Sequence, residues 1–166
     1  MKLEELYDRY GEKMYQYLAL RLGSSADAED VLQETFCRLA RYSVRWTLID
    51  NPRAFIFKVL RNEFNRHLKR RIGRKRIEGA VSEQQDNTPG NILDRPAGPE
   101  DAALAKTIER ALAELPDEQK EVIILKVYQG FSFREIAGIC RLSTATAASR
   151  YRYGMQKLRS SLEGKV

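Results

Sequence analysis

Apolar residues recur at three- and four-residue spacings along most of the chain, and this period predicts α-helices. The first such stretch ends at Gly23, a residue typical of a helix C-terminus. Ser24 and Asp27 have the spacing of a helix cap, so a second helix is expected over about 25–42. The apolar positions of these two helices include Leu3, Leu6, Tyr7, Tyr10, Met14, Tyr17, Leu18, Ala28, Val31, Leu32, Phe36 and Leu39.

A third helix is predicted after a short break in the period. Residues 43–50 have no helical spacing and are expected to form a loop. Asn51 then supplies a side-chain acceptor for a helix N-terminus, and Pro52 suits the first turn. Apolar residues continue at helical spacing to Phe64, so this helix is expected to run to about Arg71.

The helical period is lost between Gly73 and Pro99, where polar residues, glycine and proline dominate. This composition is typical of a flexible linker. Helical spacing resumes near Glu100, and no alternating pattern predicts a strand. The fold expected is therefore all-α, with two small helical domains, 1–72 and 100–166, joined by a linker over 73–99.

The C-terminal domain contains a pattern that predicts a helix-turn-helix. Ser132 and Glu135 form a capping box, in which the serine accepts from a free amide and the glutamate reaches back to the cap. This short helix is expected to end near Cys140. After a turn, Ser143 caps a second helix. An ordinary helical hairpin is the alternative, because capped helix pairs also occur in proteins that bind no DNA.

The outward face of the last helix suits contact with duplex DNA. Short polar side chains near a helix N-terminus can approach base edges, and arginines farther along can meet guanine or phosphate. The residues that this assigns to DNA are Thr144, Ala145, Thr146, Ser149, Arg150 and Arg152.

Charge is distributed unevenly along the chain, whose net charge is +6. Residues 1–36 carry eight acids and four bases, a sum of −4. Residues 61–76 carry eight bases and one acid, a sum of +7. The first segment should repel phosphates and the second should attract them, which indicates two different partners.

Aromatic and basic residues are interleaved in the loop 43–50 and the helix that follows it. Single-stranded nucleic acid is bound by this combination, since cations track the backbone and aromatic rings stack on unpaired bases. Trp46, in a polar loop, is the better stacking candidate, although it could instead anchor the loop. Phe55 and Phe64 have the spacing of core residues. The helix over 25–42 adds a polar face of Asp30, Gln33 and Glu34, which by itself could be only a solvated surface.

The sequence gives little support for an enzyme, a metal-binding protein or a membrane protein. The single histidine, His67, lies in a basic helix, and no phosphate loop, metal-ligand cluster or nucleophile motif is present, so no catalysis, cofactor or metal is expected. Cys37 and Cys140 are expected to be small buried residues in a reducing compartment. No apolar run approaches the roughly 20 residues of a membrane span, and no signal-peptide pattern is present, so a cytoplasmic protein without membrane insertion is expected.

Together and in this order, these features resemble bacterial sigma factors of the extracytoplasmic-function (ECF) type, the smallest members of the sigma-70 superfamily. The resemblance covers roughly residues 3–72 and 101–162. Besides the helix-turn-helix, its most specific segments are DAEDVLQETF at 27–36, NPRAFIFKVLRN at 51–62 and LPDEQKEV at 115–122.

The resemblance implies roles for matching positions. The segment 27–36 would dock on the clamp helices of the largest polymerase subunit through Asp30, Gln33 and Glu34. The loop 43–50 with Trp46 would capture a flipped base of the −10 element, with Asn62 taking part. The last helix would read the −35 element in the major groove. Backbone phosphates near the −10 element would be held by Arg66, Lys69, Arg70 and Arg71.

Three positions depart from the family pattern. Phe55 stands where tryptophan is usual, and Arg141 stands where the turn usually has glycine. A non-glycine residue at positive φ costs roughly 1 kcal/mol. Ala147 and Ala148 replace a common valine and lysine, so the family's −35 sequence preference does not transfer to this chain.

The function expected from the resemblance is that of an alternative sigma factor. Such a protein binds core RNA polymerase and directs promoter-specific initiation, recognising −35 duplex DNA and melted −10 DNA. An anti-sigma factor is a further expected partner. The alternative is a helix-turn-helix regulator that is no polymerase subunit and binds duplex DNA as a dimer, which predicts tight binding of an isolated palindrome.

Overall fold

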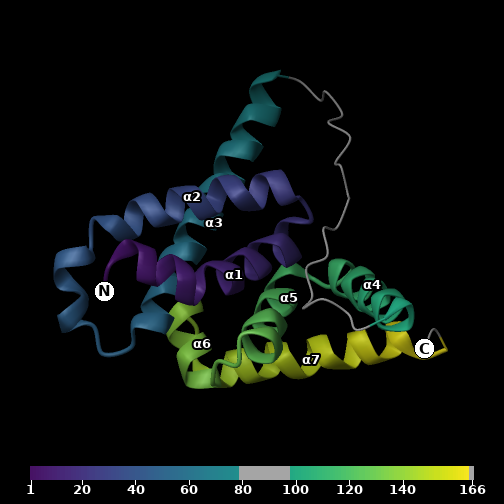
Figure 1. The fold of residues 1–166 in the computed structure, drawn as a ribbon. Helices are drawn as coiled ribbons and strands as arrows, with labels where there is room; N and C mark the ends of the chain where they lie inside the picture. The colour runs from purple at the N-terminus through teal and green to yellow at the C-terminus, as the bar shows by residue number, and fades with distance from the viewer. Residues whose placement is uncertain (79–97, 165–166) are drawn as a thin grey trace.

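The structure, a computed structural model, describes residues 1–78 and 98–164. Helices are the only regular elements in these two ranges (Figure 1), which confirms the all-α prediction. The N-terminal half contains α1 (Leu3–Leu22), α2 (Ser25–Ala40), a short 3₁₀ helix η1 (Ser43–Leu48) and α3 (Pro52–Glu78). The C-terminal half contains α4 (Pro99–Ala113), α5 (Asp117–Ile123), a π-helical turn η2 (Ile124–Tyr128), α6 (Phe133–Cys140) and α7 (Thr144–Leu162).

The N-terminal half is a three-helix unit whose ends match the sequence signals. Gly23 adopts the left-handed conformation at φ 65° and closes α1 through a bond from its N–H to the Ala19 carbonyl. The Ser24 hydroxyl accepts from the amide of Asp27 at 3.3 Å, and Asn51 Oδ1 accepts from the amide of Ala54 at 3.1 Å. The side chains buried between the three helices include Leu6, Met14, Leu18, Val31, Leu39, Ile56, Leu60 and Phe64.

The segment before α3 is more ordered than the sequence predicts. Residues 43–48 form the 3₁₀ helix η1 instead of an irregular loop. The Trp46 ring, 7% exposed, packs edge-on against Phe55 with ring centroids 5.9 Å apart. Phe55 also meets Tyr42 edge-on at 5.3 Å, so a phenyl ring fills the place where the family usually has tryptophan. Trp46 therefore anchors the segment in this state and offers no free face for stacking.

Helix α3 continues beyond the predicted end of the first domain, to Glu78. Lysine and arginine are good helix formers, and Gly73 alone does not end the helix. The last turns of α3 project away from α1 and α2 (Figure 1). Of the predicted linker, residues 73–78 are thus helical, while 79–97 lie outside the described residues.

The π-helical turn changes which residues of the C-terminal half are buried. In this turn the amide of Gln129 donates to the Ile124 carbonyl at 3.1 Å, five residues back. The wider turn shifts the phase of the side chains that follow. Val127, within the turn, is 56% exposed, whereas Gln129, directly after it, is buried. The exposed valine and the buried glutamine are the reverse of what side-chain polarity alone favours.

Helices α5 and α7 approach each other closely at Gly154. A Cβ atom at this position would lie 2.7 Å from Cδ1 of Ile123 and 3.2 Å from Cβ of Gln119. We expect Gly154→Leu to lower the free energy of unfolding by about 1–3 kcal/mol or more, because this is the usual cost of overpacking a core. Gly138→Ala is the matched control, because a Cβ at 138 meets nothing within 4 Å and alanine favours the helix. Denaturant unfolding should show a loss for the first variant and a small gain for the second; equal effects would contradict this packing.

The two halves pack directly against each other. Helix α6 lies against α3, and α1 contacts α4, α5 and η2 (Figure 1). The ring of Phe57 from α3 meets that of Phe131, between η2 and α6, with centroids 5.1 Å apart. The guanidinium of Arg53 lies over the Phe131 ring, 4.1 Å from its centroid. The mutual placement of the halves could not be predicted from the sequence.

Candidate nucleic-acid interface

Helices α6 and α7 form a helix-turn-helix with every cap that the sequence predicts. The Ser132 hydroxyl accepts from the amide of Glu135 at 3.1 Å, and Glu135 Oε1 accepts from the amide of Ser132 at 3.0 Å. The bond from the Ser132 backbone is the main cause that lowers the pKa of Glu135. At the start of α7, the Ser143 hydroxyl accepts from the amide of Thr146 at 3.0 Å. Both helix N-termini are thus fixed by local bonds.

The turn between α6 and α7 has a left-handed residue at its start although it lacks glycine. Arg141 adopts the left-handed conformation at φ 58°, alone among the described non-glycine residues. Its amide and that of Leu142 both donate to the Ala137 carbonyl, which closes α6. The backbone geometry is therefore retained at a cost of about 1 kcal/mol in conformational strain.

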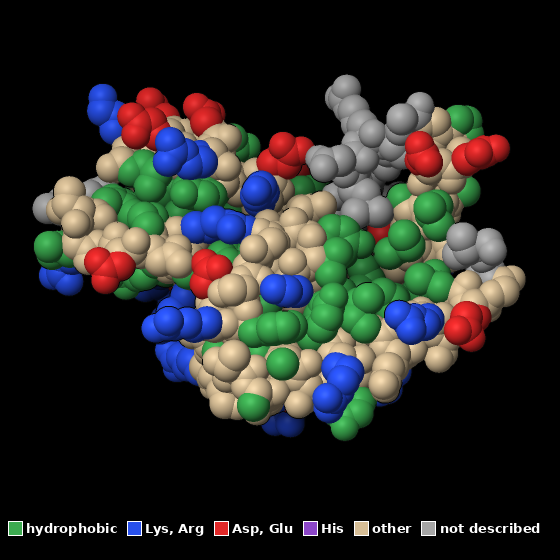
Figure 2. Space-filling model, turned by 90° about the horizontal axis from the view of Figure 1, so that it is seen from below, with side chains coloured by type: hydrophobic (Ala, Val, Ile, Leu, Met, Phe, Trp, Pro, Cys, Tyr) green, Lys and Arg blue, Asp and Glu red, His purple; other side chains and the backbone are tan. Residues whose placement is uncertain are grey.

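The face of α7 that the sequence assigns to DNA is partly free. Thr144, Ala145 and Arg152 are exposed, while Thr146 and Ser149 are half-buried. Arg150 lies 3.5 Å from the Glu118 carboxylate of α5 and would have to leave it to reach DNA. In the view from the α7 side (Figure 2), Lys and Arg side chains spread over the lower half of the face, and most Asp and Glu side chains lie toward its margins.

The two departures in α7 have different consequences. Ala147 is fully buried, so this position packs against the rest of the domain and cannot read bases. Ala148 is half-buried, and its methyl group leaves the reading face without the family's lysine charge. The face of α7 is therefore smaller and less basic at this position than a lysine would make it.

The basic end of α3 presents most of its cations to solvent. Asn62, Arg66, Lys69 and Arg70 are exposed. Arg66 also lies 3.5 Å from the buried carboxylate of Glu63, which Arg38 holds at 3.0 Å. Arg71 differs, because its guanidinium donates to Asp27 of α2 at 3.3 Å. Of the residues assigned to the −10 element, Arg71 is thus engaged within the protein and Trp46 is buried.

The polar face of α2 is exposed as the sequence predicts, and it borders a groove between α1 and α2. Asp30, Gln33 and Glu34 are all exposed. Gln33 lines the groove with Tyr7, Phe36 and other residues of both helices.

Cys37 also lines this groove and is exposed, which corrects the prediction that both cysteines are buried. Cys140 is buried, and burial raises the pKa of its thiol to about 12.

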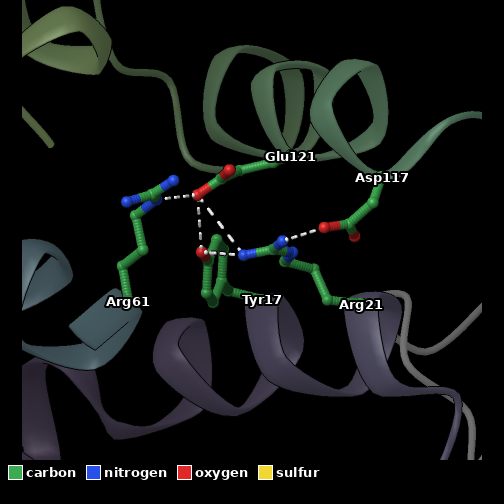
Figure 3. Close-up of polar contacts among 5 residues, drawn as sticks. All are labelled: Tyr17, Arg21, Arg61, Asp117 and Glu121. Atoms are coloured by element: carbon green, nitrogen blue, oxygen red, sulfur yellow. Dashed lines mark hydrogen bonds and ion pairs between the residues drawn. The ribbon is translucent and has the colours of Figure 1, made fainter. Parts of the chain in front are cut away.

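A polar network joins the two halves at their centre (Figure 3). The side chain of Arg21 is only 2% exposed and pairs with Asp117 of α5 at 2.7 Å. Its other terminal nitrogen donates to the Tyr17 hydroxyl at 2.8 Å, and that hydroxyl donates to Glu121 Oε1 at 3.1 Å. Arg61 of α3 donates to the same Glu121 oxygen at 2.6 Å. The carboxylate of Glu121 thus accepts from both α1 and α3.

Burial controls the charge states in this network. Burial raises the pKa of Tyr17 well above 10, so the phenol stays protonated and can donate. Burial alone would disfavour the charged form of Arg21, but contact with Tyr17, Glu121 and Asp117 raises the pKa of its guanidinium. A buried charge of this kind is tolerated because Tyr17, Asp117 and Glu121 pair with both terminal nitrogens of the guanidinium, although its Nε has no partner among the described residues.

The raised pKa of Tyr17 predicts a loss of stability at alkaline pH. The folded state holds this proton more tightly than the unfolded state, so the stabilisation is complete below pH 10 and falls as the pH rises above 10. One such group contributes up to about 1.4 kcal/mol per pH unit. Denaturant unfolding at pH 9 and pH 11 should show a shallower loss for Tyr17→Phe than for the wild type. Tyr7→Phe controls for removal of an exposed hydroxyl, and parallel losses in all three chains would exclude this role of Tyr17.

The sequence analysis predicted no polar network between the two halves. Arg21 follows Tyr17 by one helical turn on the apolar side of α1, and Glu121 directly precedes Val122 in an apolar stretch. A charged residue at an apolar position of the helical period is the available signal, since an unpaired charge is rarely buried. Asp117 lies 96 positions from Arg21, and Arg61 lies 60 positions from Glu121, so no local pattern identifies these partners.

Within residues 1–78 and 98–164, no helix has the length and apolar character needed to cross a membrane. No group of His, Cys, Asp and Glu side chains in these ranges is arranged to hold a metal ion.

Family comparisons match both halves of the chain. Residues 6–73 match sigma-70 region 2, and residues 105–158 match sigma-70 region 4. The ECF RNA polymerase sigma factor SigL of Mycobacterium tuberculosis is 33% identical over 168 residues, 97% of this chain and 89% of that protein. SigW of Bacillus subtilis is 30% identical, over 95% of this chain and 87% of that protein. SigE of Mycolicibacterium smegmatis is 32% identical, over 96% of this chain but only 61% of the longer relative.

Solved structures with the same fold cover both halves. The sigma factor RpoE from Bartonella quintana, in complex with the anti-sigma factor NepR, superposes with a TM-score of 0.69 at 25% identity. The match covers 92% of this chain and 91% of that one. CnrH in complex with the cytosolic domain of CnrY gives a TM-score of 0.67 at 22% identity and shows likeness of fold alone.

Proposed function

The chain belongs to the extracytoplasmic-function family of RNA polymerase sigma factors, and from this premise we propose that it directs promoter-specific initiation by core RNA polymerase. One observation carries the proposal. A single chain combines a fully capped helix-turn-helix with a second helical unit whose longest helix ends in exposed cations, and the two match successive sigma-70 regions. The protein acts by binding, and no covalent step is assigned to it.

The C-terminal half is proposed to hold the −35 element as duplex DNA. The N-terminus of α7 would enter the major groove, because Thr144 and Ala145 are exposed there and can approach base edges. Arg152 is exposed two turns farther along and would meet phosphate or guanine. Thr146, Ser149 and Arg150 complete the proposed contact face.

The N-terminal half is proposed to bind the melted −10 element. The exposed cations of α3 would track the strand, with Asn62 contacting the captured base. Arg71 would join them after release from Asp27. Since Trp46 is buried against Phe55, its proposed part is to shape the base-binding segment. The cations concerned are Arg66, Lys69, Arg70 and Arg71.

Two protein partners follow from the family. Asp30, Gln33 and Glu34 are proposed to contact core RNA polymerase, as their exposure on α2 permits. An anti-sigma factor is a further proposed partner, because RpoE was solved in complex with the anti-sigma factor NepR. We expect the chain to act in the cytoplasm, where polymerase and promoter DNA are found.

The proposal is tested by binding to labelled promoter DNA with and without core polymerase. A sigma factor should form a specific complex only when core polymerase is present. A dimeric helix-turn-helix regulator should instead bind a palindromic duplex tightly by itself. Specific binding without core polymerase, at the affinity of about 10⁻⁸–10⁻¹¹ M typical of such regulators, would overturn the proposal.

A further inference from the structure

The turn between α6 and α7 (Figure 1) holds Arg141 in a backbone conformation that disfavours an arginine. Its φ of 58° is left-handed, and no other non-glycine residue in 1–78 and 98–164 has a positive φ. Glycine adopts this conformation without steric cost, so arginine makes the turn less stable than glycine would. Strained residues of this kind occur mainly at functional sites, where the strain serves the function. The backbone therefore marks Arg141 as a residue whose side chain has a use.

The side chain of Arg141 does nothing for the folded chain that would explain the strain. It is exposed, and it has no hydrogen bond or ion pair with any of the described residues. Only its backbone amide is engaged, in the bond that closes α6. Arg150 differs, because it lies 3.5 Å from the carboxylate of Glu118. The guanidinium of Arg141 is thus available to a partner outside the chain.

The position of Arg141 favours a phosphate as that partner. A docked helix-turn-helix places the N-terminus of its second helix in the major groove, so the turn just before this helix lies beside the sugar-phosphate wall of the groove. Arg141 comes two residues before Ser143, the N-cap of α7. Residues 144–149 carry no charge, so the first part of α7 has no cation of its own for the nearest phosphates. Gly138, in the last turns of α6, is exposed and leaves the surface there open to a close approach.

We propose that Arg141 binds a backbone phosphate of duplex DNA at the edge of the major groove that α7 enters. A guanidinium can donate two parallel hydrogen bonds to a phosphate, and such a contact fixes the position of the protein without reading sequence. This inference rests on the proposed function, because it adds a residue to the proposed −35 contact. The strained turn is then kept because the side chain strengthens DNA binding. Stability and DNA affinity should therefore respond in opposite directions to one substitution.

This opposition is tested with Arg141→Gly in the full chain. Glycine relieves the left-handed strain, so the unfolding temperature should rise by about 2–4 °C for a chain of this size. The variant also loses the phosphate contact, so its affinity for duplex DNA should fall by about tenfold at low salt. Fluorescence anisotropy with a labelled duplex of about 30 base pairs measures this loss, and any base sequence serves, because a phosphate contact is independent of sequence. The slope of log affinity against log salt should become shallower by about one.

Two glutamine variants separate a specific contact from a general loss of charge. Arg141→Gln keeps the strain and removes the charge, so it should lose affinity as the glycine variant does without a rise in unfolding temperature. Arg110→Gln is the matched control, because Arg110 is exposed on α4, which packs near the other end of α7 (Figure 1). It should change duplex affinity by less than about twofold, the general effect of one surface charge. Arg141→Lys keeps the charge and should keep most of the affinity.

Three results would overturn the inference. The first is an equal duplex affinity of the Arg141→Gln and Arg110→Gln chains. The second is a rise in stability of Arg141→Gly without any loss of duplex affinity, because the strain would then serve some other purpose. The third is an equal loss of affinity for single-stranded oligothymidylate of the same length, because a contact at the groove edge needs a duplex. The assay uses neither polymerase nor promoter, so failure of the wild type to support initiation would overturn the proposed function alone.

Discussion

Reversing the charge of Asp30 and Glu34 to lysine should reduce affinity for core RNA polymerase by more than about 100-fold. Both side chains are exposed on α2 and are proposed to face a basic surface of the polymerase. Charge reversal replaces two attractions with two repulsions, and disrupting a close charge pair at an interface costs 2–5 kcal/mol or more. Co-migration of the variant with core polymerase in size-exclusion chromatography measures the loss.

The control for this prediction is the double variant Asp8→Lys and Glu12→Lys. It makes the same change in charge at the same four-residue spacing, on exposed positions of α1. Circular dichroism should show unchanged helicity for both double variants. If the α2 variant co-migrates with polymerase as the wild type does, or if both variants lose binding equally, the assignment of the contact to α2 fails.

Ala145→Asp should abolish use of the −35 element while leaving polymerase binding intact. Ala145 is exposed in the first turn of α7, where a carboxylate is favourable for the helix because of its dipole. In the major groove the same carboxylate meets phosphates and base acceptors and repels them. Since a disrupted base contact costs about 1–3 kcal/mol, and the added charge repels further, transcription from a promoter that needs its −35 element should fall by at least tenfold.

The matched control is Ala103→Asp, the same substitution at an exposed position near the start of α4. It should leave transcription within about twofold of the wild type. Both variants should bind core polymerase normally. Equal activity of the Ala145→Asp and wild-type chains would remove α7 from the −35 contact.

The parts of the fold set by local chemistry could be predicted from the sequence. The caps at Ser24, Asn51, Ser132 and Ser143 all form as expected, because each joins groups three residues apart. The helix-turn-helix follows from two of these caps, and Arg141 adopts the conformation that its turn requires. The exposed polar face of α2 could likewise be placed from helical spacing alone.

The errors arise where tertiary packing overrides the local pattern. Cys37, expected to be buried, is exposed beside the groove between α1 and α2. Trp46 is buried on Phe55, which agrees with the alternative that it anchors its segment. Val127 is exposed within the π-helical turn, and the residue pattern does not predict that the helix widens there. The contact between the halves depends on Glu121 and on partners far along the chain. Such pairings are non-local and leave no signature in the helical period.

The most direct test of the central claim is run-off transcription by core RNA polymerase on a library of randomised promoters, with and without this chain. The account predicts that adding the chain produces transcripts from a subset of templates that share two separated sequence elements, and that core polymerase alone does not use them. Transcript patterns that are unchanged by the chain, while the same chain co-migrates with core polymerase, would contradict it.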